Sequence, residues 1–437
     1  MFLSHEVDPR SATAVVRARL PRSVAGSLGL AADLTRRGGA APVPGAGSTA
    51  DLWLALATLA AHDVGAARAV EPHLDATAIL DQAREAGTVV LPTRASSADR
   101  FTWGVFAAEG PGAKLVAEPA ATAGSATAEP AATAGSVIAA GAGDDRTSWT
   151  LTGTKPWCSL AGVLDGALVT AWVGDERRLF AVDLRQPGVE VVPGAWHARG
   201  LVEIPSGPVT FASVPATPVG EPGWYLRRPG FEWGGIAVAA CWYGGAVGVA
   251  GTLLRSAVAR DPDPWLLRAL GVVDERLGDA RRALEEAAVA VDSGRAVGQE
   301  ARLLAKRTRA TVAHAAEDVL AAVGGALGPA PLASDPEHAK RVADLELYLR
   351  QRHASKDDAS LGGAVRDAAV AAAAAAASAS AAASAAAAVP AADDVTLPGG
   401  PAAPDALGAS PRRAVDVGGT VVGARTGSTG TAGIAPW

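Results

Sequence analysis

Apolar side chains recur at helical intervals along the first part of the chain. Residues 51–60 carry a broad apolar face, and Leu74, Ile79 and Leu80 continue the pattern in a second helix. Residues 38–47, which precede the first of these segments, are rich in glycine and proline, which indicates a loop. We therefore predict that residues 1–98 form an N-terminal helical domain.

The pattern changes to strands near residue 99. Short β-branched or aromatic runs, separated by Gly, Pro or charged turns, stand at residues 101–106, 149–152, 168–173, 179–184 and 208–211. This spacing is typical of a small antiparallel barrel or sandwich, with a turn at Gly153-Thr154. We predict a middle β domain over 99–225. Its residues 117–147 contain a small-residue sequence that occurs twice, which predicts a flexible low-complexity insertion.

Helical periodicity returns after residue 226. One predicted helix covers 234–258. Apolar residues spaced three and four apart predict two more helices, one that contains Leu284 and one that contains Val312. A fourth is predicted from Pro336 to Gly362. We expect a four-helix bundle over 226–363. Residues 364–437 are rich in Ala, Ser, Pro and Gly, and although alanine has helix propensity, we predict a disordered tail.

Charge and cysteine content narrow the class of protein. The net charge of −6 gives no indication of binding to nucleic acid or to an anionic membrane. Cys158 and Cys241 are too few for a disulfide framework or a four-cysteine zinc site, and we expect no metal. The chain starts without a basic, apolar leader, and the apolar stretch 234–254 is interpreted as a core helix. We predict a cytoplasmic protein with no membrane span.

Five short segments add specific motifs. Their residues are Glu-Gly-Pro-Gly at 109–112, Leu-Thr-Gly-Thr-Lys-Pro-Trp-Cys-Ser at 151–159, Pro-Val-Gly at 218–220, Gly-Gly-Ala-Leu-Gly at 324–328 and Ala-Asp-Leu at 343–345. In order and spacing they resemble motifs of the acyl-CoA dehydrogenase family, over about residues 50–362. The resemblance implies an α+β fold with an N-terminal helical domain, a central small β-barrel and a C-terminal four-helix bundle.

The resemblance also implies FAD as cofactor. Trp157 would lie against the isoalloxazine ring and Ser159 would hydrogen-bond near N5, while Glu109 belongs to the loop that holds the flavin pyrimidine. The alternatives are a barrel-core tryptophan and a turn hydroxyl. Cys158 should point away from both neighbours as a buried, inert thiol.

Four further residues match positions near the flavin diphosphate. Gly324, Gly325 and Gly328 would let the backbone approach it, or else they form a helix C-cap. Arg260 would contact the diphosphate of a neighbouring subunit. Asp261-Pro262 replaces the Phe-Gly that follows this arginine in the family, so a surface arginine is the alternative.

The carboxylate that removes the substrate proton in the family is missing. Its position falls at Arg350-Gln351-Arg352-His353. Glu232 is one substitute, or else a charge that favours the helix N-terminus. His353 is another, because a histidine near the flavin occurs in the oxygen-using branch of this fold; its alternative is a solvated polar residue.

The resemblance implies an acyl-CoA dehydrogenase-like enzyme of fatty acid metabolism. It would dehydrogenate an acyl-CoA or related thioester between Cα and Cβ and pass the hydride to flavin N5. An electron-transfer flavoprotein would accept the electrons, and the enzyme would be a homodimer or homotetramer. Two alternatives remain open at this point: a flavin-dependent monooxygenase of the same fold, and a non-catalytic flavin- or acyl-CoA-binding protein.

Overall fold

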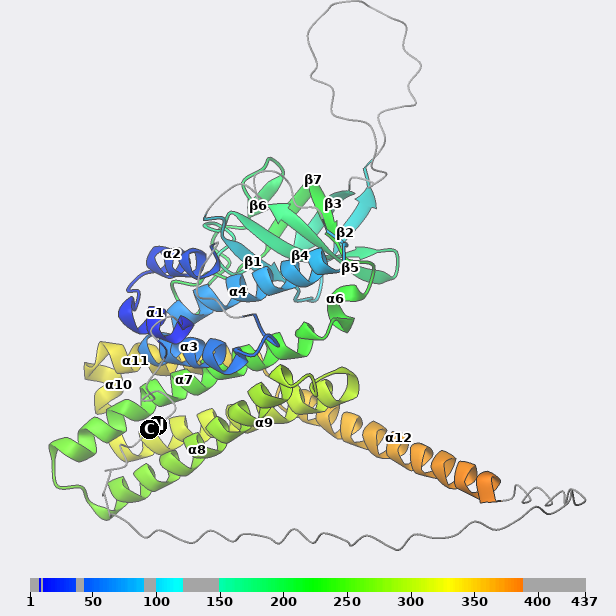
Figure 1. Cartoon of the computed structure of the whole chain (residues 1–437). Coiled ribbons are helices and arrows are strands. Elements are labelled where there is room, and N and C mark those ends of the chain that lie inside the picture. The colour runs from blue at the N-terminus through cyan, green and yellow to red at the C-terminus, as the bar shows by residue number, and fades with distance from the viewer. Residues whose placement is uncertain (1–7, 9–10, 37–42, 90–99, 121–148, 388–437) are drawn as a thin grey trace, which may run out of the picture. The chain divides into compact units, whose positions relative to one another are not determined.

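The structure is a computed structural model, and it describes residue 8 and residues 11–36, 43–89, 100–120 and 149–387. The residues up to Arg366 belong to one compact unit, and the later part of the last helix belongs to a second. The first unit contains the helices and strands that surround the candidate site (Figure 1).

The described residues of the N-terminal layer form the helices α1 (Ala12–Ala18), α2 (Val24–Thr35), α3 (Thr49–His62) and α4 (Val64–Glu85). Ser11, Ser23 and Asp63 cap the starts of α1, α2 and α4 with side-chain oxygens. Helix α4 contacts both the β domain and the later helices, so it lies between them (Figure 1). Its side chains therefore reach the space between the two.

Within residues 100–120 and 149–219, the β domain contains the strands β1 (Trp103–Phe106), β2 (Leu115–Pro119), β3 (Trp149–Lys155), β4 (Gly166–Val173), β5 (Glu176–Asp183), β6 (Val189–Val191) and β7 (Val209–Val219). The pairing path β4-β2-β3-β7-β5 returns to β4, so these five strands close into a barrel. Strand β1 pairs with β4 and β6 pairs with β7. The predicted small barrel is confirmed.

Two local predictions in the β domain differ from the structure. The turn predicted at Gly153-Thr154 is wrong: both residues lie inside β3, where Gly153 has a φ of +124° and the pairing register shifts. A bulge, rather than a reversal, accounts for this glycine. Of the predicted insertion 117–147, residues 117–119 end strand β2 and residue 120 follows it, whereas residues 121–147 lie outside the described residues.

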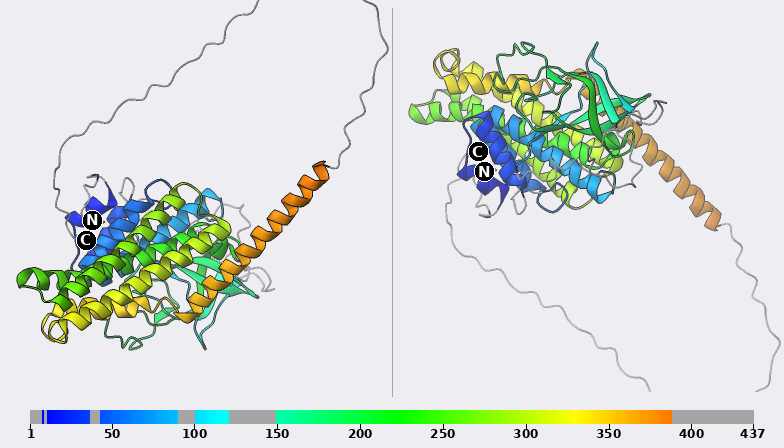
Figure 2. Two further views of the ribbon diagram at one scale, coloured as in Figure 1. Left: turned by 90° about the horizontal axis from the view of Figure 1, so that it is seen from below. Right: turned by 90° about the horizontal axis from the view of Figure 1, so that it is seen from above.

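The C-terminal bundle begins after the short α6 (Trp224–Arg227) with α7 (Gly230–Ala259), α8 (Pro264–Asp292) and α9 (Gly298–Leu327). These three helices lie side by side (Figure 2). After α10 (Ala330–Ser334), the predicted helix 336–362 proves to be two helices, α11 (Pro336–Leu349) and α12 (Ser355–Ala387). The break follows from Ala354, whose φ of +40° is incompatible with a continuous right-handed helix.

Helix α12 also corrects the predicted tail. Residues 364–387 are helical, not disordered, because a run of alanines costs little side-chain entropy in a helix. Residues 388–437 lie outside the described residues. Among the helices described, Gly230–Ala259 and Ser355–Ser384 are long and apolar enough to span a membrane by length and composition. In the first, 83% of the apolar window is buried within the protein, as expected of a core helix.

One polar cluster joins the three layers. The ammonium group of Lys340 on α11 lies 2.6 Å from Glu203, 3.2 Å from Asp63 and 2.5 Å from Asp344. The buried Asp344 also accepts a 2.6 Å hydrogen bond from the backbone N–H of Leu201. Asp63 caps α4, and Leu201 and Glu203 belong to a barrel loop, so the cluster fixes α11 against both.

Candidate functional site

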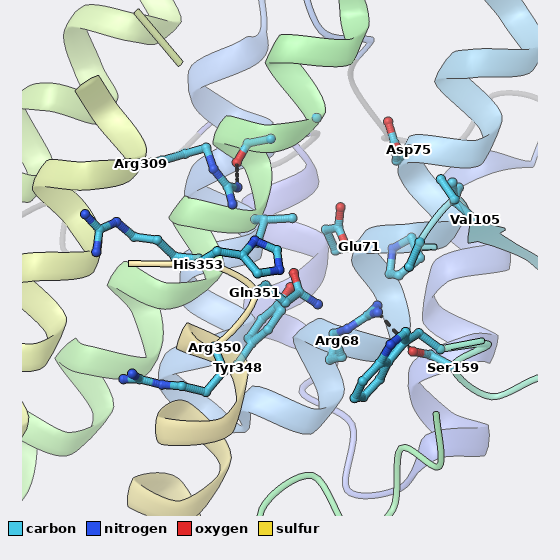
Figure 3. Close-up of a pocket in the computed structure, with 18 of the residues that line it drawn as sticks. Arg68, Glu71, Asp75, Val105, Ser159, Arg309, Tyr348, Arg350, Gln351 and His353 are labelled. Carbon is cyan, nitrogen blue, oxygen red and sulfur yellow. Dashed lines mark hydrogen bonds between the residues drawn. The ribbon is translucent and has the colours of Figure 1, made fainter. Parts of the chain in front are cut away.

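A cavity of about 790 Å³ lies where α4, the barrel loops and the bundle meet. Its volume falls within the roughly 300–1,000 Å³ typical of small-molecule sites. The wall is formed by α4, the segments after β1 and β3, the first turns of α7, the middle of α9, and residues 347–358. Figure 3 shows labelled side chains from these elements converging on one space.

The barrel wall contains a strained loop. After β3, Trp157 and Leu160 adopt φ values of +60° and +59°, which are unusual for residues other than glycine. This backbone leaves the Trp157 side chain 59% exposed at the cavity while Cys158, between the two, is buried. The predicted burial of Cys158 is confirmed, and desolvation raises its pKa to about 12, so the thiol is inert.

Ser159 is held by hydrogen bonds from two directions. The Arg68 guanidinium on α4 donates to its hydroxyl at 3.0 Å, and the Ser206 hydroxyl lies 2.7 Å away. The same guanidinium lies 5.8 Å from the centre of the Tyr348 ring. Ser159 is therefore a fixed polar group beside an exposed aromatic face.

Glu109 lies at the end of the cavity nearest the barrel. Its carboxylate accepts a 2.6 Å hydrogen bond from the ammonium group of Lys155, whose side chain is only 1% exposed. Lys155 also donates to the Thr170 hydroxyl at 2.8 Å. Burial lowers the pKa of Lys155, and Glu109 opposes that change. The pair fixes the loop after β1 to the barrel.

Helix α4 presents a charged face to the cavity. Arg68, Glu71 and Asp75 recur at intervals of three and four residues, so they lie on one side of the helix. Asp75 pairs with the Arg228 guanidinium at 3.4 Å. Glu71 is 6% exposed, and desolvation raises its pKa to about 7 although Arg68 opposes the change.

The bundle contributes a third wall. Arg309 on α9 donates to the carbonyl oxygen of Gly235 at 2.6 Å, and its guanidinium lies 4.7 Å from the centre of the Trp242 ring. Glu232 lies in the first turn of α7, 3.7 Å from the Arg302 guanidinium. No carboxylate among the residues that the structure describes lies within ion-pair distance of Arg309.

The break between α11 and α12 brings residues 350–353 to the cavity. Arg352 is buried and pairs with Asp358, whereas Arg350 pairs with Glu317 at 3.0 Å. The backbone N–H of His353 donates to Asp357 at 3.2 Å, and its imidazole lies 3.9 Å from that carboxylate. His353 thus lines the cavity from a capped turn (Figure 3).

The structure brings together part of the predicted set. Trp157, Ser159, Glu109, Glu232 and His353 all line the cavity. The remaining predicted residues lie away from it: Gly324 and Gly325 in the last turns of α9, Gly328 at its C-cap with a φ of +65°, and Arg260 at the C-cap of α7. For these four, contact with a flavin diphosphate stays a prediction.

The sequence analysis missed the charged face of α4. A signal for it exists, because Arg68, Glu71 and Asp75 recur at spacings of three and four, which places them on one side of the helix. The spacing alone does not show whether this side of the helix lines a cavity or faces solvent. The burial of Glu71 makes that distinction, and burial is a tertiary property.

Comparisons with known proteins place this geometry in a known fold. KijD3, solved with FMN and a dTDP-linked amino-keto sugar, superposes with a TM-score of 0.65 at 18% identity, over 84% of this chain and 95% of its own. Dibenzothiophene monooxygenase TdsC from Paenibacillus sp. A11-2 gives 0.61 at 15% identity, over 80% and 95% of the two chains. Butyryl-CoA dehydrogenase from Megasphaera elsdenii superposes with a TM-score of 0.60 at 15% identity, over 82% of this chain and 94% of its own.

The sequence comparisons give no such match. No protein-family model matches the chain, and no curated protein matches it. The structural similarity extends over nearly the whole of each neighbour, and these neighbours include an acyl-CoA dehydrogenase. At these identities the similarity establishes architecture rather than reaction. The chain has the acyl-CoA dehydrogenase fold.

Proposed function

We propose that this protein is a flavin-dependent oxidoreductase that binds the isoalloxazine ring in the 790 Å³ cavity. The observation that carries the proposal is Trp157, a large aromatic side chain held exposed at the cavity by a strained backbone. Strain of this kind costs of order 1–3 kcal/mol and persists where the surrounding structure imposes it, commonly at functional sites. An exposed indole face beside the fixed hydroxyl of Ser159 suits a planar heteroaromatic ring.

The residues present fit a flavin. Trp157 offers an aromatic face, Ser159 offers a hydroxyl near the ring, and Val105 and Ala107 offer apolar surface. When bound, a flavin supplies two-electron redox chemistry that no side chain of the cavity has. We propose FAD, as the sequence motifs imply, with FMN as the alternative because KijD3 is solved with FMN. Gly324, Gly325 and Gly328 would contact the FAD diphosphate only across a subunit boundary.

The substrate that we propose is polar on the side that faces α4 and α9, although apolar side chains also line the cavity. Arg68, Glu71, Asp75, Arg228 and Arg309 line it, and burying an aliphatic chain against such groups would desolvate charges without replacing their water. This wall does not favour a fatty acyl chain. A thioester with a short polar acyl group, or another small polar molecule, satisfies it. The reaction we propose is dehydrogenation, with a proton passed to a side chain and a hydride passed to the bound flavin.

A second candidate is monooxygenation. His353 lines the cavity from the segment where the dehydrogenases of this family have their carboxylate, and an imidazole there can donate or accept a proton near the flavin. TdsC, a monooxygenase, shares the fold. The two candidates differ in whether the reduced flavin reacts with oxygen to form an oxygenated product.

Flavin titration tests the proposal directly. Purified apoprotein is titrated separately with FAD and with FMN, and flavin fluorescence is followed. We expect one flavin per chain, with quenching that Trp157→Ala weakens and that Trp265→Ala does not. Trp265 is an exposed tryptophan on α8 and serves as the matched control. Absence of binding, or equal affinity in both variants, would contradict the proposed site.

A further inference from the structure

Glu71 differs from the other charged residues of the cavity, because it has no partner within the part of the chain that the structure describes. Asp75 is paired with Arg228, Glu109 with Lys155, and Glu232 lies near Arg302. Glu71 forms no hydrogen bond or ion pair with any residue that the structure describes, although it is only 6% exposed. A buried carboxylate without a partner is costly, which calls for an explanation other than stability.

The groups around Glu71 leave its carboxylate available to the cavity. Arg68 directs its guanidinium to Ser159, and Arg309 directs its own to the backbone of Gly235. Figure 3 shows Glu71 on the inner wall between these two arginines. The carboxylate therefore meets whatever occupies the cavity, and α4 holds it rigidly there.

The ionisable groups that face Glu71 come from five helices. They are Arg68 and Asp75 of α4, Tyr225 of α6, Cys241 of α7, Arg309 of α9 and Tyr348 of α11. Burial raises the pKa values of Tyr225, Cys241 and Tyr348, so these three stay neutral at neutral pH. The charged neighbours are two arginines and the paired Asp75, and their effects on Glu71 oppose one another.

We propose that Glu71 is the residue that exchanges a proton with the substrate, in place of the carboxylate missing from residues 350–353. This inference rests on the proposed function. One substrate C–H or X–H bond breaks and its proton goes to a Glu71 carboxylate oxygen. The neighbouring C–H bond delivers a hydride, with two electrons, to the bound flavin, so the substrate is oxidised and the flavin is reduced. Glu71 then releases the proton to water through the cavity mouth.

The environment of Glu71 suits this role. An ordinary glutamate is too weak a base to remove a proton from carbon at pH 7, whereas desolvation raises the pKa of Glu71 to about 7. Its basicity is therefore matched to neutral pH. Arg68 and Arg309 lie close enough to stabilise negative charge that develops on the substrate as the proton leaves.

Chemical labelling tests the accessibility and the protonation of Glu71 without any flavin. A water-soluble carbodiimide with a small amine labels protonated carboxyl groups, and mass spectrometry locates the label. We expect labelling of Glu71 to persist at pH 6.5 and to fall by half near pH 7, whereas exposed glutamates lose it near their ordinary pKa of about 4.3. No labelling of Glu71 at any pH, or a loss together with the exposed glutamates, would overturn the proposal.

Glu71→Gln then tests the catalytic role in flavin-loaded protein. With any substrate that reduces the wild-type flavin anaerobically, we expect the reduction rate to fall by about 100-fold or more, with flavin affinity unchanged. The rise of the rate through pH 7 should also disappear. Glu286→Gln, at an exposed position on α8, is the matched control. Equal rates for Glu71→Gln and wild type would refute the role of Glu71.

The two experiments separate this inference from the proposed function. A protein that binds neither FAD nor FMN refutes the flavin site, and the labelling of Glu71 still reports whether the carboxylate faces the cavity and holds its proton at neutral pH. A protein that binds flavin but leaves Glu71 unlabelled refutes the inference alone.

Discussion

Replacing Glu71 by glutamine should stabilise the protein at alkaline pH and leave it unchanged at acidic pH. Desolvation raises the pKa of Glu71 from 4.5 to about 7, so the folded state binds its proton more tightly than the unfolded state does. Stability from this group is fully present below pH 4.5 and is lost as the pH rises through 7. Glutamine resembles the protonated side chain at every pH, so the variant keeps this stability as the pH rises.

The magnitude follows from the two pKa values. At 1.36 kcal/mol per unit of pKa, the difference between 4.5 and 7 corresponds to about 3 kcal/mol at pH 8. No discount for solvent screening applies, because Glu71 is 6% exposed. Against a typical unfolding free energy of roughly 5–15 kcal/mol, this is a large effect for one residue.

The assay is urea unfolding of wild type and Glu71→Gln at pH 4.5, 6 and 8. His73 complicates the wild-type curve, because burial lowers its pKa to about 4 and its contribution is lost as the pH falls below 6.5. His73 is common to both proteins, so their difference isolates Glu71. A constant difference across the three pH values, or a glutamine variant less stable at pH 8, would refute the reasoning.

Three other outcomes are expected. Trp157→Ala should weaken flavin binding by about tenfold or more, equivalent to about 1.4 kcal/mol, in a fluorescence titration; unchanged affinity would remove it from the site. Glu109→Gln should lower the free energy of unfolding by up to about 3 kcal/mol, because the buried Lys155 ammonium group loses its counter-charge, and Glu109→Gln/Lys155→Met should recover part of the loss in the same urea assay. His353→Ala should slow the reaction of reduced flavin with oxygen in stopped-flow spectroscopy if monooxygenation is the function, and an unaltered oxidation rate would favour dehydrogenation.

The sequence was sufficient for the architecture because the motifs and the periodicities agree. Short β-branched or aromatic runs bounded by turn residues marked the barrel strands, and spacings of three and four marked α8 and α9. One error is the alanine-rich segment 364–387, which is helical although disorder was predicted. The other two lie where the backbone at one residue departs from a local pattern. Ala354 interrupts a helix that periodicity extends to 362, and Gly153 forms a bulge where a glycine-threonine pair suggested a turn.

The site residues that belong to motifs were predicted from the sequence, and those that only burial distinguishes were missed. Trp157, Ser159 and Glu109 were found by resemblance, and the structure brings them to one cavity. Glu71 was missed because no motif contains it, and its distinguishing property is that it is buried without a partner among the described residues. That property depends on where Arg68 and Arg309 direct their guanidinium groups, which no local sequence pattern determines.

The central claim is that the cavity holds a redox-active flavin and a polar substrate. The most direct test is an anaerobic visible spectrum of the flavin-supplied protein, before and after addition of acyl-CoAs that differ in chain length and polarity. We predict a bound flavin whose visible band bleaches with a short, polar acyl group and not with a long aliphatic one. A protein that stays colourless when FAD and FMN are supplied would contradict the account, and bleaching by long aliphatic acyl-CoAs alone would contradict its polar substrate.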